Sequence, residues 1–154
     1  MKVLVAYFSQ TGKTKSVAEA IFESIGGEKE LKKLDEVDSL EGYDLSFIGF
    51  PIIAFGPAKE GKEFLEQKAA GKKVALFITH AAPEDQEGVE AWLDKCREAA
   101  SSAELVGFFH CQGELSEALS FANLAASLVC TRHGAEPPTM EELRAFTARY
   151  GLDN

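Results

Sequence analysis

The sequence predicts an α/β fold in which a parallel β-sheet is covered by helices on both faces. Three observations predict it. Short apolar runs alternate with segments of helical periodicity, five runs of strand character occur, and polar or glycine-containing segments follow most of these runs. Alternating strands and helices favour a parallel sheet with right-handed crossovers. A length of 154 residues suits one compact domain, so we expect a single domain over residues 1–154.

The five predicted strands are recognised by apolar, β-branched and aromatic residues in short runs. They are Lys2 to Phe8, part of Glu28 to Val37, Asp44 to Phe50, Lys73 to Thr79 and Glu104 to His110. The second run is polar, and we expect it to be a short strand at the edge of the sheet. Pro51 is expected to end the third strand.

Apolar residues at helical spacing mark the segments between the strands. The first helix carries Val17, Ile21 and Ile25 and ends at Gly26-Gly27. The others are Ala58 to Lys68, a helix with Val89, Trp92, Leu93, Cys96 and Ala100, a helix with Leu115, Leu119, Ala122, Ala126 and Val129, and a last helix with Leu143, Phe146 and Tyr150. Trp92, Cys96 and Cys130 are expected to pack inside.

The composition narrows the class of protein. The formal net charge is -9, which argues against binding to a nucleic-acid backbone and suits a basic protein partner. Three cysteines, Cys96, Cys111 and Cys130, are too widely spaced for a pair of metal ligands, and their odd number argues against a disulfide framework. No segment approaches the ~20 apolar residues of a membrane span, and no leader pattern precedes the first strand. We therefore expect a cytoplasmic protein.

The segment FSQTGKTKS follows the first predicted strand and opens the first helix. Its Gly-Lys-Thr resembles a triphosphate P-loop, but Tyr7 stands where that motif requires its first glycine. A site for one terminal phosphate is more complete: three hydroxyl side chains surround Gly12, and the first N–H groups of the helix lack partners and carry positive partial charge. The alternative is a hydroxyl-rich helix cap with no ligand.

The segment YFSQTGKT resembles the phosphate loop of flavodoxins, Ser/Thr-x-Thr-Gly-x-Thr. GFPIIAFGPAKEGKEFLEQ and GFFHCQGELS resemble a bacterial subset of short-chain flavodoxin-like proteins with Cys-Gln-Gly after the last strand. This resemblance implies a flavodoxin-like three-layer sandwich whose five-stranded parallel sheet has the order 2-1-3-4-5. It also implies FMN as the cofactor and electron transfer as the function.

The resemblance implies that FMN contacts the loops after four strands, and no catalytic residue or metal ligand is predicted. The expected cofactor-binding residues are Ser9, Gln10, Thr11, Gly12, Lys13 and Thr14; Pro51, Ile52, Ile53, Phe55 and Gly56; Thr79, His80 and Ala81; and His110, Cys111, Gln112 and Gly113. Gly56 is expected to let a peptide turn toward the reactive flavin nitrogen. Phe55 either contacts the ligand or packs into the core.

The loop after the fourth strand departs from the family pattern, because Thr79 to Pro83 contains no Tyr or Trp. One face of the flavin is therefore expected to stay open to a substrate or a protein. His80 either donates to the carbonyl groups of the ring or carries a proton there, or it is a solvated loop histidine. Acidic residues near the flavin would lower its potential and attract basic partners, or form an ordinary acidic loop. They are Glu84, Asp85, Glu87 and Glu114.

Three functions on this fold stay open. The first is a monomeric electron carrier between redox partner proteins, a reductase and an acceptor. The second is an FMN-dependent reductase of a small substrate such as a quinone, and the third is a redox accessory module. A receiver-type signalling domain is excluded, because Ser9-Gln10 and Pro51-Ile52 occupy the places of its acidic residues.

Overall fold

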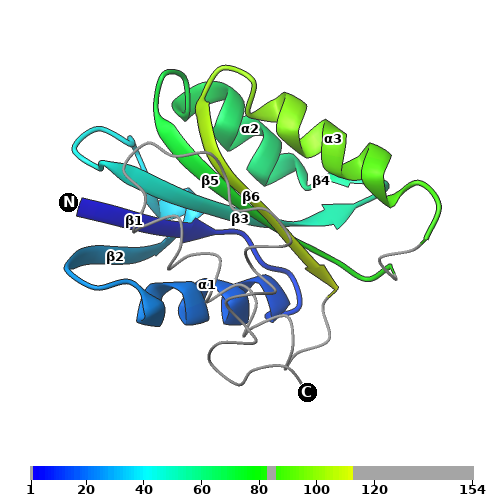
Figure 1. Ribbon diagram of the computed structural model, residues 1–154, viewed down its shortest axis with the longest axis horizontal. Helices are drawn as coiled ribbons and strands as arrows, with labels where there is room; N and C mark the ends of the chain where they lie inside the picture. The colour runs from blue at the N-terminus through cyan, green and yellow to red at the C-terminus, as the bar shows by residue number, and fades with distance from the viewer. Residues whose placement is uncertain (1, 83–85, 113–154) are drawn as a thin grey trace, which may run out of the picture.

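The computed structural model describes residues 2–82 and 86–112 of the chain (Figure 1). Its elements are β1 (Lys2–Tyr7), α1 (Lys13–Ser24), β2 (Glu28–Lys33), the short 3-10 helix η1 (Leu34–Glu36), β3 (Leu45–Ile53), β4 (Gly56–Pro57), α2 (Lys59–Lys68), β5 (Lys73–His80), α3 (Val89–Ala99) and β6 (Glu104–Gln112). The two helices predicted after residue 113 lie outside the described residues.

The sheet has the predicted topology. Its strand order is β2-β1-β3-β5-β6, and each neighbouring pair along this path is parallel. With the small β4 set aside, this is the order 2-1-3-4-5, which confirms the predicted fold. The polar second strand does lie at an edge, paired only with β1 among the described strands.

Helices cover both faces of the sheet (Figure 1). In β1, Val3 and Val5 pack on the same side as Ile21 of α1, whereas Leu4 and Ala6 join the opposite cluster with residues of α2 and α3. This alternation follows from the two-residue period of a strand, and burial of both faces explains the continuous apolar run. The sheet is therefore the central layer, and its ends carry the loops.

The third strand does not end at Pro51, as predicted, but continues to Ile53 and turns back into β4. Proline is tolerated because β1 has already ended beside it: Tyr7, the last residue of β1, pairs with Gly49. The carbonyl of Pro51 accepts a hydrogen bond of 3.1 Å from the N–H of Ala58. Residues 51–57, expected to form the loop after the third strand, thus form a hairpin.

The hydrophobic core is closely packed on both faces of the sheet. Phe47, Phe50 and Phe77 are fully buried. A methyl group at Gly61 would lie 2.3 Å from the ring of Phe50, so this glycine lets α2 approach β3 closely. No helix within the described ranges is long and apolar enough to cross a membrane.

Candidate functional site

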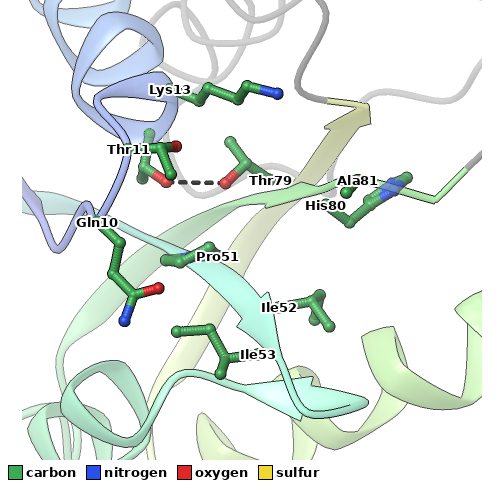
Figure 2. Close-up of a pocket in the computed structure, with 10 residues that line it drawn as sticks. Gln10, Thr11, Lys13, Pro51, Ile52, Ile53, Thr79, His80 and Ala81 are labelled. Carbon is green, nitrogen blue, oxygen red and sulfur yellow. Dashed lines mark hydrogen bonds between the residues drawn. The ribbon is translucent and has the colours of Figure 1, made fainter.

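A cleft lies where the carboxyl ends of β1, β3 and β5 meet (Figure 2). Ligands bind at this edge in open parallel sheets, where the strand order reverses. The cleft measures about 200 Å³. It is lined by Gln10, Thr11, Lys13, Thr14, Pro51, Ile52, Ile53, Thr79, His80 and Ala81. These residues come from the first, second and third of the four segments predicted from the sequence.

The start of α1 forms one wall of the cleft. Gly12 precedes the helix in a left-handed conformation, with φ of 90°, which a residue without a side chain adopts freely. The N–H of Gly12 donates a 3.0 Å hydrogen bond to Oγ of Ser9, which tightens the turn. Among the described residues, no side chain caps the first helical turn, and it contains no acidic residue. Its N–H groups and Lys13 therefore present positive charge to the cleft.

Thr14 and Thr79 join this wall to the end of β5. Their hydroxyl oxygens lie 2.8 Å apart, and both side chains are buried. A mutual hydrogen bond uses one hydroxyl hydrogen, so the pair keeps a second one for another acceptor. Thr14 thus has a structural partner that the sequence did not predict.

The β3–β4 hairpin forms the apolar wall, through Pro51, Ile52 and Ile53 (Figure 2). Its tip residues Ala54 and Phe55 both have positive φ, 52° and 65°. These two residues form a two-residue hairpin turn with positive φ at both positions, a conformation that Asn-Gly normally adopts. Non-glycine residues in this region are strained, and such strain clusters at functional sites.

Phe55 neither packs into the core nor lines the cleft. It is 66% exposed, its ring centroid lies 5.3 Å from that of Trp92 on α3, and its carbonyl accepts a 3.3 Å hydrogen bond from Nζ of Lys95. Trp92, which was expected to lie inside the core, is only partly buried and packs against the outside of the core. Gly56 lies in β4 outside the positive-φ region, so the unusual backbone falls on the two residues before it.

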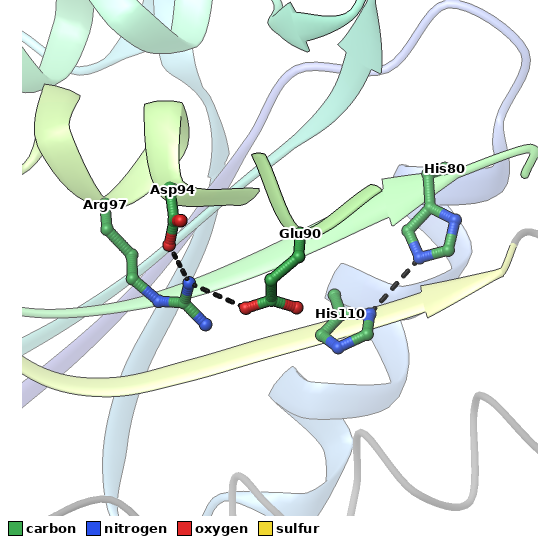
Figure 3. Close-up of polar contacts among 5 residues, drawn as sticks. All are labelled: His80, Glu90, Asp94, Arg97 and His110. Carbon is green, nitrogen blue, oxygen red and sulfur yellow. Dashed lines mark hydrogen bonds and ion pairs between the residues drawn. The ribbon is translucent and has the colours of Figure 1, made fainter. Parts of the chain in front are cut away.

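His80 ends β5 and is buried, with 4% of its surface exposed. Its Nδ1 lies 2.8 Å from the carbonyl oxygen of Ala82, and its Nε2 lies 3.2 Å from Nδ1 of His110 (Figure 3). It is therefore not a solvated loop histidine. The sequence predicted both histidines as site residues but not their contact, although they follow neighbouring strands in the predicted order.

The other predicted residues lie around the cleft or beyond the described part. Ser9 lines a second cavity of about 460 Å³ between β1, the end of β2 and α2. Cys111 and Gln112 end β6, where their backbones pair with Thr79 and His80. Gly113 lies outside the described residues, as do Glu84, Asp85 and Glu114. Glu87 is exposed just before α3.

The cleft combines an anion site with an apolar wall. None of the ten lining residues is acidic, and within the described ranges no cluster of His, Cys, Asp or Glu could hold a metal ion. A cleft of this size is smaller than the ~300 Å³ or more that encloses a drug-sized ligand. The residues fit a phosphate group at α1 and one face of a flat ring at the hairpin, with part of the ring uncovered.

Similar proteins point to the same family. The sequence matches the flavodoxin domain over residues 4–142. It is 36% identical over 124 residues to the flavodoxin-like domain-containing protein BilS of Clostridioides difficile (strain CD3), a match that covers 77% of this chain and 70% of that protein.

Two solved structures share the fold at somewhat lower identity. Oxidised flavodoxin 2 from Bacillus cereus is 27% identical, with a TM-score of 0.61, covering 86% of this chain and 100% of that one. A flavoprotein from Lactobacillus acidophilus NCFM, solved in complex with FMN, is 26% identical, with a TM-score of 0.57, covering 71% of this chain and 92% of that one. The match over most of the sequence and the shared fold show that this chain belongs to the flavodoxin domain family.

Proposed function

We propose that this protein binds FMN and carries electrons between a reductase and an acceptor protein. The observation that carries the proposal is the position of two unlike walls in one cleft. The uncapped start of α1, with Thr11 and Lys13, faces the apolar end of β3. A phosphate ester attached to an apolar aromatic ring has this same division of chemistry.

The relatives support FMN as the ligand. The flavoprotein from Lactobacillus acidophilus NCFM was solved in complex with FMN, and it is 26% identical to this chain. In the proposed complex, residues 10–14 would hold the phosphate through hydroxyl and backbone donors. Residues 51–53 and 79–81 would contact the ring. Bound FMN would supply the capacity to accept and release one or two electrons.

The surface beside the cleft suits contact with another protein. Ile53 and Phe55 are the exposed large apolar residues of the described part, 36% and 66% exposed, and both belong to the hairpin that forms the cleft wall. Apolar and aromatic groups of this kind are favoured at protein interfaces. The net charge of -9 would attract a basic partner at a salt-dependent rate.

Binding of FMN and of riboflavin, measured by titration calorimetry, tests the phosphate site. We expect clear preference for FMN. Thr11→Ala should weaken FMN binding and leave riboflavin binding nearly unchanged, because riboflavin lacks the phosphate. A lost hydrogen bond to a charged group costs roughly 1.5–3 kcal/mol, which is about 10- to 150-fold in Kd.

Ser102→Ala is the matched control for loss of a hydroxyl group. Ser102 is exposed and precedes β6. It therefore lies near the amino-terminal ends of the strands, whereas the cleft lies at their carboxyl ends. This variant should bind both flavins like the wild type. Equal affinity of the wild type for FMN and riboflavin would show that residues 10–14 do not bind the phosphate. Absence of flavin binding would overturn the proposed function.

A second candidate is an FMN-dependent reductase of a small substrate such as a quinone. It is favoured by one observation: Phe55 turns toward Trp92, so within the described residues no Phe, Tyr or Trp side chain lines the cleft. Turnover of a nicotinamide cofactor and a quinone by the FMN-loaded protein alone would support the reductase. An electron carrier should show such turnover only after a separate reductase is added.

A further inference from the structure

The second cavity, which Ser9 lines, has no part in the proposed function. It measures about 460 Å³, more than twice the volume of the cleft. This volume lies within the range of about 300–1,000 Å³ that is usual for ligand pockets. The residues around the cavity therefore decide which chemical group it can hold.

The cavity lies where the connection from β2 to β3 contains no full helix. Parallel strands are usually joined by a crossover helix, but residues 34–44 form only the short η1 and irregular chain. Leu34, Val37 and Leu40 of this connection are buried in the same cluster as Phe64 of α2. The connection and α2 therefore lie against the same face of the sheet, and the cavity opens between them.

The floor of the cavity is apolar and partly aromatic. Leu34 and Phe64 line it and are each only 5% exposed. Phe8, which follows β1, also lines the cavity and is partly buried against the core. Such a floor suits the apolar part of a ligand, and aromatic rings also attract cations.

The rim of the cavity carries more negative than positive charge. The carboxylates of Asp35, Glu60 and Glu63 line it, together with the ammonium groups of Lys33 and Lys68. All three acidic residues are exposed. Among the described residues, Asp35 and Glu60 form no ion pair. These two carboxylates are thus available to a positively charged group.

Lys68 is already engaged within the protein. Its ammonium group donates a hydrogen bond to the carbonyl oxygen of Val37 and lies 5.3 Å from the ring centroid of Phe64. The neighbouring connection adds further negative charge, because residues 35–44 contain five acidic residues and no Lys or Arg. A ligand with a positive charge is therefore attracted to this rim.

Arg97 shows how this chain holds a cation between carboxylates and an aromatic ring. Its Cζ lies 4.1 Å from the ring centroid of Phe108, and its Nη1 lies 2.7 Å from Asp94 and 3.3 Å from Glu90 (Figure 3). A guanidinium group is flat and has several N–H donors, so it can stack on a ring and pair with carboxylates at once, unlike an ammonium group. The cavity offers the same two kinds of partner.

We propose that the second cavity binds an arginine side chain of a basic partner protein. The apolar stem lies on the floor, and the guanidinium group meets the carboxylates of Asp35 and Glu60. The net charge of -9 favours a basic partner. Because Oγ of Ser9 accepts the 3.0 Å hydrogen bond from Gly12 in the phosphate loop, a protein docked here lies beside the cleft. A redox role for that partner rests on the proposed function, whereas arginine binding requires no FMN.

The test is an NMR titration of the backbone amides of the full chain, with and without FMN. The probe is N-acetyl-arginine amide, which presents the side chain as a polypeptide does. We expect saturable shifts at residues 33–35 and 60–68. N-acetyl-citrulline amide has nearly the same shape without the charge. It should bind about tenfold more weakly, because each exposed ion pair changes the affinity by up to about fivefold.

The variant Asp35→Asn/Glu60→Gln removes two charges from the rim. It should weaken binding of the arginine probe by about tenfold, for the same reason. Glu19→Gln/Glu23→Gln is the matched control. It removes the same charge from exposed positions on α1, which covers the other face of the sheet, and should leave the affinity nearly unchanged.

Equal weakening in the two variants would show attraction to the net charge alone and overturn the inference. Equal binding of the arginine and citrulline probes would overturn it without any variant. Shifts at these residues with benzamidine but not with the arginine probe would assign the cavity to a small aromatic cation instead. A chain that binds the arginine probe but no FMN would overturn the proposed function and leave the arginine site intact.

Discussion

The hydroxyl oxygens of Thr14 and Thr79 lie 2.8 Å apart and join the start of α1 to the end of β5. Only 2% of Thr14 and 3% of Thr79 is exposed, so their hydrogen bond is shielded from bulk water. Because the phosphate loop continues into α1 through Thr14, the contact fixes the loop against the sheet. It also leaves one hydroxyl hydrogen of the pair for a ligand.

Thr14→Ala should therefore destabilise the protein even without a ligand. The substitution leaves the buried hydroxyl of Thr79 without its partner, which costs about 1–3 kcal/mol of unfolding free energy. Urea unfolding measures this cost. Thr14→Ser is the matched control, because it keeps the hydroxyl and should lose much less. Equal losses in the two variants would show that the methyl group of Thr14, and not the hydrogen bond, stabilises the contact.

Magnesium ATP should not bind at the loop that follows β1. Tyr7 stands where a triphosphate loop needs glycine, and it is buried within β1, paired with Lys33 and Gly49 on the two neighbouring strands. Millimolar magnesium ATP should therefore leave the melting temperature unchanged, whereas FMN should raise it. Stabilisation by ATP equal to that by FMN would contradict this interpretation.

The strands and helices of the described part could be predicted because their signals are local. The run from Lys73 to Thr79 is apolar on both faces, which a central strand of a parallel sheet requires, and it forms β5 with one residue added. The loop residues of the cleft could be predicted for a related reason. Parallel strands bring their carboxyl ends to one edge, so Thr11, Pro51 and Thr79 had to meet.

The hairpin after β3 could not be predicted from local signals. Its tip, Ala54-Phe55, carries none of the Asn or Gly residues that usually mark a turn with positive φ. The contacts that hold it come from elsewhere in the chain, namely the ring of Trp92 and the ammonium group of Lys95 on α3. The pairing of His80 with His110 likewise depends on side-chain direction at two strand ends, which a sequence pattern does not give.

Strain at the hairpin tip predicts that Ala54→Gly stabilises the protein. A left-handed conformation costs a residue with a side chain about 1–2 kcal/mol, and glycine avoids this cost. Glycine also gains freedom in the unfolded chain, about 0.5–1 kcal/mol, so the net gain in unfolding free energy should be up to about 1.5 kcal/mol. Chemical unfolding measures it.

Ala91→Gly is the matched control for this substitution. Ala91 is exposed within α3, where glycine costs about 1 kcal/mol relative to alanine. The same chemical change should thus have opposite signs at the two positions. A loss at Ala54 as large as the loss at Ala91 would show that the hairpin tip is not strained.

Cys96 on α3 should be inert in the native protein. Burial raises the pKa of its thiol from the usual 9.0 to about 12, an effect that the positive charge of Arg97 only partly opposes. At about pH 8 roughly one native molecule in 10⁴ would carry the reactive thiolate. Iodoacetamide should therefore modify Cys96 only after unfolding in urea, as peptide mass spectrometry of each cysteine can show.

The same pKa shift sets the direction of a pH effect on stability. The folded state keeps the thiol protonated, so its contribution is complete below about pH 9 and is lost as the pH rises toward about 12, where the unfolded chain has already released the proton. Cys96→Ala removes this contribution. The unfolding free energy of the wild type should consequently fall more steeply than that of the variant in this window. For the labelling experiment, rapid modification of native Cys96 at about pH 8 would contradict the assigned burial.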